Sequence, residues 1–214
     1  MEKLLAESAE VFDMDDTLVS RTVIHRAVSN LKTRNPLRRP YPYTRLEQLP
    51  EVNHRRVEGV ITGKVERWQF KDHMKRTAIA TTRDLLIQSA QSGNDIYILT
   101  GRSTDSEWYD GTEEQLEREG ILPYVSEPDK RLHTPGGRHT ALSKVHGLFV
   151  LSQLYKTTRM NEDDWSTTEL GARLLRERGV SFRYIYHGFP SYYPTDEQLR
   201  ANPNISVLDL SKTR

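Results

Sequence analysis

The sequence predicts an α/β fold in which a mainly parallel β-sheet lies between two layers of helices. Two observations support this prediction. Short apolar segments alternate with longer amphipathic segments along most of the chain, which is the pattern of strands joined by helical crossovers. Three of the short segments end at or next to polar side chains, namely Asp13, Thr100 and Asp163. Parallel strands end along one edge of a sheet, where such folds bind ligands, so these residues are expected to lie close together.

The elements are expected in the following order. A buried strand over residues 9–13 ends on an acid, and a helix over residues 67–92 ends at a glycine. The clearest strand of the sequence follows at residues 95–100. The remaining expectations are a helix at 106–119, a short strand at 121–125, a loop at 127–138, a helix at 140–155, a weak strand at 157–161, a helix at 166–178 and a strand at 181–186. No element is predicted from Pro190 onward.

Residues 20–65 are expected to form a separate insert, while residues 1–19 and 66–214 form the core. The insert contains four X-Pro steps, which mark turns and extended chain. Residues 21–83 contain 15 Lys or Arg and 5 Asp or Glu, although the net charge of the chain is only +1. This asymmetry indicates a cationic surface that faces a polyanion or a phosphorylated substrate. A solvated basic segment without a partner is the alternative.

The composition excludes several classes of protein and site. The chain has no cysteine, so a disulfide framework and a cysteine-ligated metal are excluded. No run of about 18 apolar residues occurs, so no membrane span is expected. The first residues lack the basic and apolar segments of a secretory signal, and a cytoplasmic protein is therefore expected. The seven histidines show no spacing typical of zinc ligands.

The segment Val11-Phe12-Asp13-Met14-Asp15-Asp16-Thr17 carries the main candidates for chemistry. Asp13 and Asp15 are two residues apart after a strand, so two carboxylates and a backbone carbonyl can converge on one hard cation such as Mg²⁺. A carboxylate held in this way can attack phosphorus and form an aspartyl-phosphate. The second carboxyl can protonate the leaving oxygen and later deprotonate water. The alternative is that these acids only cap a helix.

Thr100, Gly101 and Arg102 are a second group of candidates. A hydroxyl at a strand end, followed by a glycine amide, makes a small cradle for phosphate, and Arg102 can approach the same anion or stabilise the turn. An ordinary strand-to-helix turn is the alternative. Lys144 lies near the start of a predicted helix, where its ammonium can offset charge on Asp13 and on a transferring phosphoryl group. The alternative for Lys144 is a surface position.

Glu162, Asp163 and Asp164 form an acidic cluster after the weak strand. Mg²⁺ usually takes one or two protein carboxylates and keeps several waters, so one of these three would complete a metal site. We expect Asp163 in that role, with Asp164 or Glu162 as the fallback. The alternative is an N-terminal helix cap, and different members of the cluster can fill the two roles.

These residues, in this order, resemble the four motifs of the phosphatases of the haloacid dehalogenase (HAD) superfamily: Asp13-x-Asp15-x-Thr17, Thr100, Lys144 and Asp163. The resemblance covers about residues 8–18 and 67–188. It implies a Rossmann-like three-layer α/β/α sandwich, bound Mg²⁺ and a phosphorylated substrate. The acid at position 15 implies phosphate rather than haloacid chemistry, because dehalogenases of this superfamily lack it.

The resemblance also implies a role for each residue. Asp13 would be the nucleophile and a metal ligand. Asp15 would be the general acid and base, with its backbone carbonyl on the metal. Thr100 would bind the phosphoryl group, Lys144 would stabilise it, and Asp163 would complete the metal site.

The later half of the chain resembles a narrower group, the phosphatase domain of phage polynucleotide kinase and related RNA-repair phosphatases. This resemblance rests on residues 98–102, the acids near 162 and the helix that leads into Gly179-Val180. Those domains often carry an arginine at the fourth motif. This chain has Glu162-Asp163-Asp164-Trp165 there and lacks the arginine.

The insert is expected to supply a small or irregular cap over the site, because 86 residues separate Asp13 from Thr100. Its aromatic and basic side chains can contact a nucleic-acid end through stacking and phosphate pairing. The arginines considered for this contact are Arg38, Arg39, Arg45, Arg55 and Arg56. A basic lid for a small anionic substrate and a dimerisation surface are the alternatives.

The sequence thus predicts a Mg²⁺-dependent phosphomonoester hydrolase that acts through an aspartyl-phosphate on Asp13. A polynucleotide end phosphatase in RNA or DNA repair is one alternative. A non-catalytic nucleic-acid-binding protein on the same scaffold is the other.

Overall fold

A computed structural model describes the residue ranges 6–20, 42–48, 74–102, 106–125, 131–133, 140–188 and 191–212. Its centre is a six-stranded sheet in the order β3-β2-β1-β4-β5-β6, with every neighbouring pair parallel. The strands are β1 (Ala6–Phe12), β2 (Asp95–Thr100), β3 (Arg131–His133), β4 (Tyr155–Glu162), β5 (Val180–Tyr186) and β6 (Ile205–Asp209). The predicted α/β fold with a parallel sheet is confirmed.

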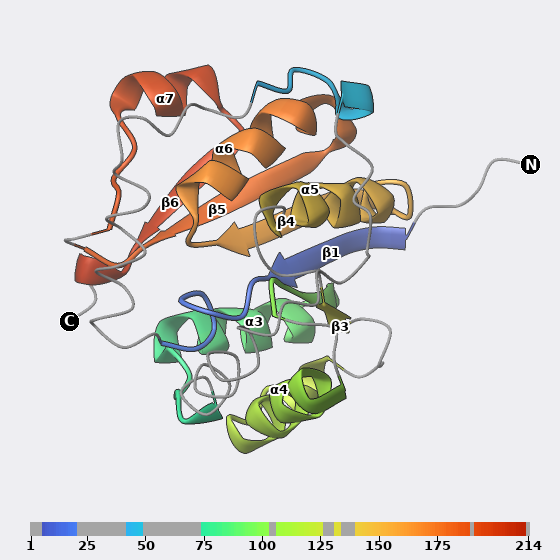
Figure 1. The fold of residues 1–214 in the computed structure, drawn as a ribbon, viewed down its shortest axis with the longest axis vertical. Coiled ribbons are helices and arrows are strands. Elements are labelled where there is room, and N and C mark those ends of the chain that lie inside the picture. Colours follow the sequence, from blue (N-terminus) through green and yellow to red (C-terminus); the bar gives the residue numbers. More distant parts are fainter. Residues whose placement is uncertain are drawn as a thin grey trace, which may run out of the picture.

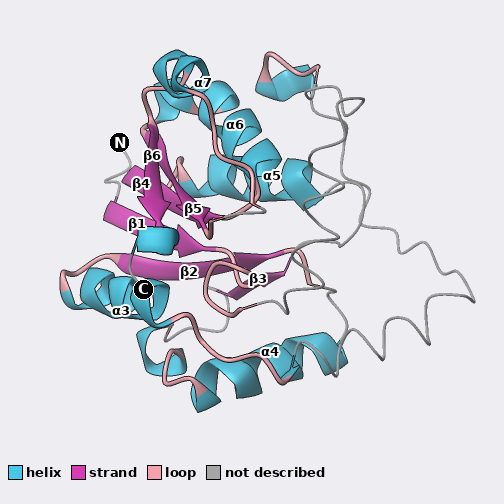
Figure 2. Ribbon diagram, turned by 90° about the vertical axis from the view of Figure 1, so that its left-hand side faces the viewer, coloured by secondary structure: helices cyan, strands magenta, loops and turns pink. Residues whose placement is uncertain are grey.

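Helices cover both faces of this sheet, as Figures 1 and 2 show. One face carries the two helices that follow β1 and β2 in the chain, and the other carries the three that follow β3, β4 and β5. The helices are α3 (Ala80–Gln91), α4 (Ser106–Arg118), α5 (Thr140–Leu151), α6 (Trp165–Leu174) and α7 (Asp196–Ala201). Among the described residues, no helix is long and apolar enough to span a bilayer.

The core lies in two layers, because consecutive side chains of a strand point to opposite faces. Val11 belongs to a cluster that includes Met160 and Phe182 and packs against α5 and α6. Phe12 belongs to a second cluster, which includes Ile98 and packs against α3 and α4. Burial on both faces therefore fixes β1 at the centre of the sheet and sets where the next residue, the predicted nucleophile, emerges.

The structure interrupts the helix that the sequence predicts over residues 67–92. Met74 is helical, the chain turns at Lys75, and α3 starts only at Ala80; residues 67–73 lie outside the described part of the chain. Just before α3 the chain is extended, and Ala78 forms an antiparallel bridge with Val19. Tertiary pairing with the segment after β1 thus overrides local helix propensity here.

The third strand also differs from its prediction. Residues 122–124 form a short 3₁₀ helix, in which Pro123 lies near the start, and not the expected strand at 121–125. The strand is β3, Arg131–His133, which falls within the expected loop at 127–138 and pairs with the end of β2.

The remaining differences lie in the later half of the chain. β4 was expected to be weak, yet it runs for eight residues between β1 and β5. α5 ends at Leu151 and not at 155, and α6 ends at Leu174 before a short 3₁₀ helix. The segment after Pro190 supplies α7 and the edge strand β6, with a capping box at Thr195. A short helix and an edge strand carry little periodicity, so the sequence alone did not indicate them.

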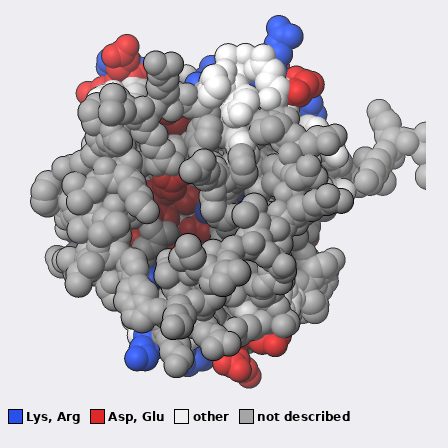
Figure 3. All heavy atoms as spheres, in the orientation of Figure 1, with Lys and Arg blue, Asp and Glu red and all other residues white. Residues whose placement is uncertain are grey.

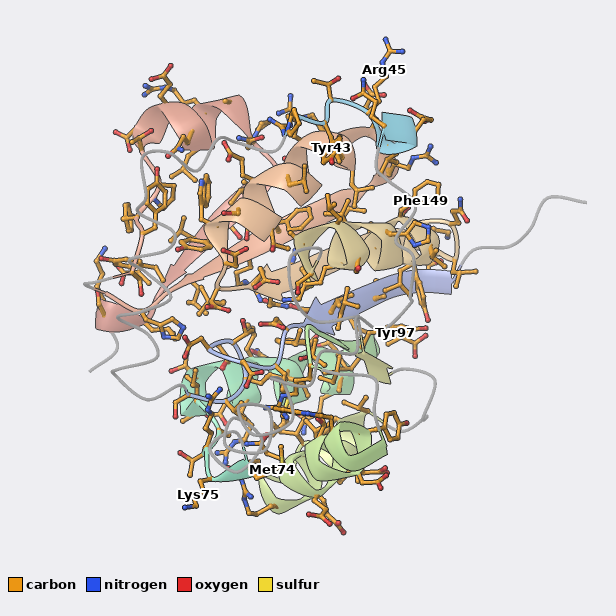
Figure 4. The ribbon with its side chains drawn as sticks, in the orientation of Figure 1. Tyr43, Arg45, Met74, Lys75, Tyr97 and Phe149 are labelled. Carbon is orange, nitrogen blue, oxygen red and sulfur yellow. The ribbon has the colours of Figure 1, made fainter. Side chains whose placement is uncertain are left out.

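The described part of the predicted insert is residues 42–48. Tyr43 and Leu46 pack against the core cluster of α5 and α6, whereas Arg45 is exposed and points away from the body of the molecule (Figure 4). The other four arginines considered for nucleic-acid contact lie outside the described residues. The backbone amide of Ser20 donates to the carbonyl of Thr77 at 3.0 Å, so the residues at the two ends of the segment 21–76 lie side by side.

Candidate active site

Asp13 and the residues after it form a tight, buried turn at the carboxyl end of β1. The Asp13 amide donates to the carbonyl of Asn161 in β4 at 3.0 Å, and the amides of Leu18 and Val19 both donate to the carbonyl of Met14. Asp16 has a φ of 63°, a left-handed conformation that Asp tolerates better than most residues. The turn therefore fixes the Asp13 and Asp15 carboxylates beside the ends of the neighbouring strands.

Lys144 joins Asp13 to the acidic cluster. Its Nζ lies 2.8 Å from Oδ1 of Asp13 and 2.6 Å from Oε2 of Glu162, and all three side chains are at most 6% exposed. The ammonium comes from the first turns of α5, and the two carboxylates come from the ends of β1 and β4. The residue predicted from the helix start is thus brought to Asp13, and the alternative of a surface lysine is wrong.

Burial and charge act in opposite directions on this group. Burial works to lower the pKa of Lys144, but the charges of Asp13 and Glu162 and their hydrogen bonds outweigh it and raise that pKa, so Lys144 stays cationic. Burial raises the pKa of Glu162 to about 7, opposed by Lys144 and aided by the charges of Asp13 and Asp164. When the Asp13 and Glu162 carboxylates are both ionised, their two negative charges exceed the single positive charge of Lys144.

That excess lies where a cation fits. One oxygen each from Asp13, Glu162 and Asp163 lie within 4.8 Å of one another, and Thr17 donates to Asp163 at 3.4 Å. All three ligands are carboxylates, the donors that Mg²⁺ prefers. Figure 3 shows acidic side chains set back in the middle of the face where β1 and β4 end. The donor set therefore suits a hard divalent cation, with Asp13 and Asp163 as predicted and Glu162 beside them.

Asp164 does not belong to this group. It is the N-cap of α6, and its side chain accepts hydrogen bonds from the amide of Thr167 at 3.1 Å and from the Thr167 hydroxyl at 2.7 Å. The acidic cluster thus divides between the two roles considered for it, with Asp164 in the capping role.

This division predicts opposite phenotypes for two neighbouring substitutions. Asp164→Ala is expected to lower the free energy of unfolding by about 1 kcal/mol, because a helix cap is lost, and to leave Mg²⁺ binding in place. Asp163→Asn is expected to leave stability nearly unchanged without metal and to weaken Mg²⁺ binding. Denaturant unfolding and calorimetric titration with Mg²⁺ measure the two effects. Weakened metal binding in Asp164→Ala alone would contradict the assignment.

The raised pKa of Glu162 predicts a pH dependence of metal binding. Between pH 4.5, which is the ordinary pKa of a glutamate, and about pH 7, Glu162 holds a proton in the folded protein that it has lost in the unfolded chain. The contribution of Glu162 to stability therefore falls as pH rises through this window. Mg²⁺ competes with that proton, so its stabilising effect should be smaller at about pH 5.5 than at about pH 8. Melting temperatures with Mg²⁺ or EDTA test this, and Glu162→Gln should remove the difference between the two pH values.

Thr100 lies at the end of β2 and is almost fully buried. Its Oγ1 accepts from the amide of Arg102 at 3.3 Å, across the turn at Gly101. A Cβ on Gly101 would lie 2.6 Å from Cγ2 of Thr140 at the start of α5, so only glycine fits without a shift. The glycine thus lets the end of β2 approach the helix that carries Lys144.

Arg102 binds Asp15. Its Nε and Nη2 donate to the two carboxylate oxygens of Asp15 at 3.1 and 2.8 Å, in a bidentate pair. Arg76, from the segment before α3, adds a contact to Oδ1 of Asp15 at 3.0 Å. The Arg102 side chain thus contacts Asp15 rather than its own turn, and its role in binding an anion stays a prediction. Sequence reasoning missed Arg76, because an arginine in a basic stretch carries no signal of its own.

The site therefore has two halves of different charge. On the β4 side, Lys144 contacts Asp13 and Glu162, and the Asp163 carboxylate lies beside theirs, which gives two more negative than positive charges when all are ionised. On the β2 side, two arginines surround Asp15, which gives one extra positive charge. A divalent cation fits the first half and an anion such as phosphate is attracted to the second.

Comparisons with known proteins support the fold. No family model and no curated protein matches the chain. A HAD family hydrolase from Deinococcus radiodurans, with bound phosphate and sodium, is 18% identical with a TM-score of 0.52, and the match covers 98% of this chain and 94% of that one. A Clostridium difficile protein assigned as a phosphatase is 13% identical with a TM-score of 0.54, over 99% and 98% of the two chains.

A third solved structure is a Bacillus subtilis protein assigned as a HAD hydrolase and bound to magnesium. It is 13% identical with a TM-score of 0.52, and the match covers 94% of this chain and all of that one. None of these three is described as a polynucleotide phosphatase, so they give no support to the narrower resemblance. At these identities the likeness concerns the fold: the chain has the α/β fold of the haloacid dehalogenase hydrolases.

Proposed function

We propose that this protein is a Mg²⁺-dependent phosphomonoesterase in which Asp13 is the nucleophile. The observation that carries the proposal is the buried contact of Lys144 with both Asp13 and Glu162, beside a third carboxylate from Asp163. A buried excess of carboxylates is costly to a fold unless a cation offsets it. Such a group is therefore better explained by a metal and phosphate site than by a role in stability.

Asp13 attacks phosphorus in the first step. Its carboxylate oxygen forms a bond to the phosphoryl group while the bond to the leaving oxygen breaks, and the product is an aspartyl-phosphate. Lys144 stabilises the negative charge of the phosphoryl oxygens, and the Thr100 hydroxyl binds one of them. Asp13, Glu162 and Asp163 would hold the metal, which when bound screens the charge between the nucleophile and the phosphate.

Water attacks the aspartyl-phosphate in the second step. The new bond from water oxygen to phosphorus forms as the bond to Asp13 breaks, which releases inorganic phosphate and restores the Asp13 carboxylate. Asp15 accepts the proton of the water, and it gives that proton to the leaving oxygen in the first step of the next turnover. Burial of the whole turn keeps other water away from the intermediate.

The direct test is turnover of an aryl phosphate by the purified protein, with Mg²⁺ and with EDTA. Release of phosphate that requires Mg²⁺ is the expected result. Absence of turnover toward aryl phosphates and toward a panel of phosphorylated metabolites and oligonucleotides would refute the proposal. It would instead favour the non-catalytic nucleic-acid-binding alternative.

A polynucleotide end is the second candidate substrate, and the charge asymmetry favours it. Most of the basic residues of 21–83 lie between Ser20 and Thr77, whose backbones are hydrogen-bonded to each other directly after the turn that carries Asp13. Cationic chain is thus attached next to the reactive carboxylate. An oligonucleotide with a terminal phosphate should then be preferred over the free nucleotide, and the preference should fall with rising salt. Equal turnover of both substrates at all salt concentrations would exclude this candidate.

A further inference from the structure

Helix α4 lies behind the two arginines that bind Asp15 and contacts both of them. Thr112 accepts a hydrogen bond from Nη1 of Arg102 at 3.1 Å and donates its own proton to the carbonyl of Trp108 at 2.7 Å. Gln115, one turn further, donates to the carbonyl of Arg76 at 2.9 Å. Thr112 and Gln115 are at most 1% exposed, so these contacts are shielded from water.

The same helix fixes the backbone from which Arg76 projects. Arg118 donates to the carbonyl of Arg76 at 2.7 Å and to that of Met74 at 2.8 Å. Glu119 accepts from the amide of Ala78 at 2.9 Å. Figure 4 shows Met74 beside α4, in agreement with these contacts. Hydrogen bonds from the C-terminal end of α4 therefore hold the backbone of residues 74–78 in place, and Arg76 reaches Asp15 from a fixed position.

Arg102 has little freedom to leave this arrangement. Three of its nitrogens are committed, Nε and Nη2 to Asp15 and Nη1 to Thr112. Its side chain is 1% exposed and that of Arg76 is 3% exposed. The planar guanidinium forms a fork that matches a carboxylate, so its orientation fixes the orientation of the Asp15 plane. The Thr112 hydroxyl holds the guanidinium on the side away from Asp15, and so it fixes the plane of the Asp15 carboxylate.

We propose that Thr112 is a positioning residue: it orients Arg102, which together with Arg76 holds the Asp15 carboxylate in place for the second chemical step. This rests on the proposed phosphatase function. In that step the water proton passes to Asp15 while the bond between phosphorus and Asp13 breaks. A carboxylate that has turned away from the water cannot accept the proton, whereas Asp13 can still attack the substrate. Loss of the Thr112 hydroxyl therefore slows hydrolysis of the intermediate more than its formation.

The test is Thr112→Val, which removes the hydroxyl and keeps the shape, compared with Thr112→Ser, which keeps the hydroxyl. With an aryl phosphate that leaves without protonation, the Val variant should lose about tenfold in kcat, the range for a hydrogen bond to a charged group. Rapid mixing should show an initial burst close to one aryl alcohol per enzyme, because the aspartyl-phosphate accumulates. KM should fall together with kcat, and the Ser variant should behave as the wild type.

The outcomes test the proposed phosphatase function and the positioning role of Thr112 separately. A wild type without turnover refutes the proposed function, and the positioning role with it. If the wild type is active and Thr112→Val has the same kcat, the positioning role is refuted and the proposed function is not. A merely structural role would lower the burst amplitude and the steady rate together, in proportion to the folded fraction measured by thermal melting. If the Val variant does not fold, Gln115→Met gives the same comparison from the Arg76 side, and an unchanged kcat there refutes the proposal.

Discussion

Replacing Asp13 with Asn is expected to abolish phosphatase activity, with a loss in kcat of about 10⁴-fold or more, as is typical when a nucleophile is removed. The amide keeps the shape of the carboxylate but is a poor nucleophile and cannot form the aspartyl-phosphate. It also removes one negative charge from a group of three carboxylates and one ammonium, of which only Asp163 is partly exposed. The variant should therefore fold, and in the absence of Mg²⁺ it should be as stable as the wild type or more so.

The matched control is Asp16→Asn, the same chemical change three residues along the same turn. Asp16 is buried and adopts a left-handed conformation, which Asn also tolerates, so the turn should be retained. The activity of Asp16→Asn should stay within about threefold of the wild-type activity, which is the effect expected of a minor change in packing. Acid quenching during turnover should trap phosphate on the wild-type protein and on Asp16→Asn but not on Asp13→Asn. Turnover by Asp13→Asn at the wild-type rate would show that another group is the nucleophile.

The parts of the fold that the sequence predicted are those with strong local signals. The sequence predicts β2 residue for residue, since four consecutive apolar or aromatic residues, 96–99, are followed by Thr100-Gly101. The sequence also predicts β1 and β4, with bounds that differ from the observed ones by up to three residues, and it predicts β4 as a weak strand because Lys156, Thr157 and Arg159 interrupt the apolar pattern. Those side chains are exposed, and the strand is held by pairing with β1 and β5 on its two sides. The central position of β4 depends on its pairing with β1 and β5, which cannot be inferred from the residues of β4 alone.

The candidate site could likewise be predicted only in part from the sequence. The structure brings Asp13, Lys144 and Asp163 together as expected, because all three follow from the rule that ligands bind at the ends of parallel strands. The partners of Asp15 could not be predicted. Arg76 reaches it only because residues 77–78 pair with the chain after the nucleophile turn, a long-range contact with no periodic signature.

Lys144→Met is expected to have the second-largest effect, and on two properties at once. Activity should fall by about 10²- to 10³-fold, since the developing charge on the phosphoryl group loses its fixed cation. Stability without metal should fall by about 3–5 kcal/mol, because Asp13 and Glu162 are left buried without a counter-charge. Met fills much of the space of the lysine stem, so the loss reports charge more than packing.

The double variant Lys144→Met/Glu162→Gln separates these two roles of the lysine. Removing the Glu162 charge relieves the buried repulsion, so the double variant should be more stable than Lys144→Met, by an amount that reports the coupling of the pair. Mg²⁺ should restore stability to Lys144→Met as well, since it supplies positive charge to the same carboxylates. Activity should not return in either case, because neither change puts a fixed cation beside the phosphoryl group. Recovery of stability without recovery of turnover would show that Lys144 has a catalytic role beyond balancing the charge of Asp13 and Glu162.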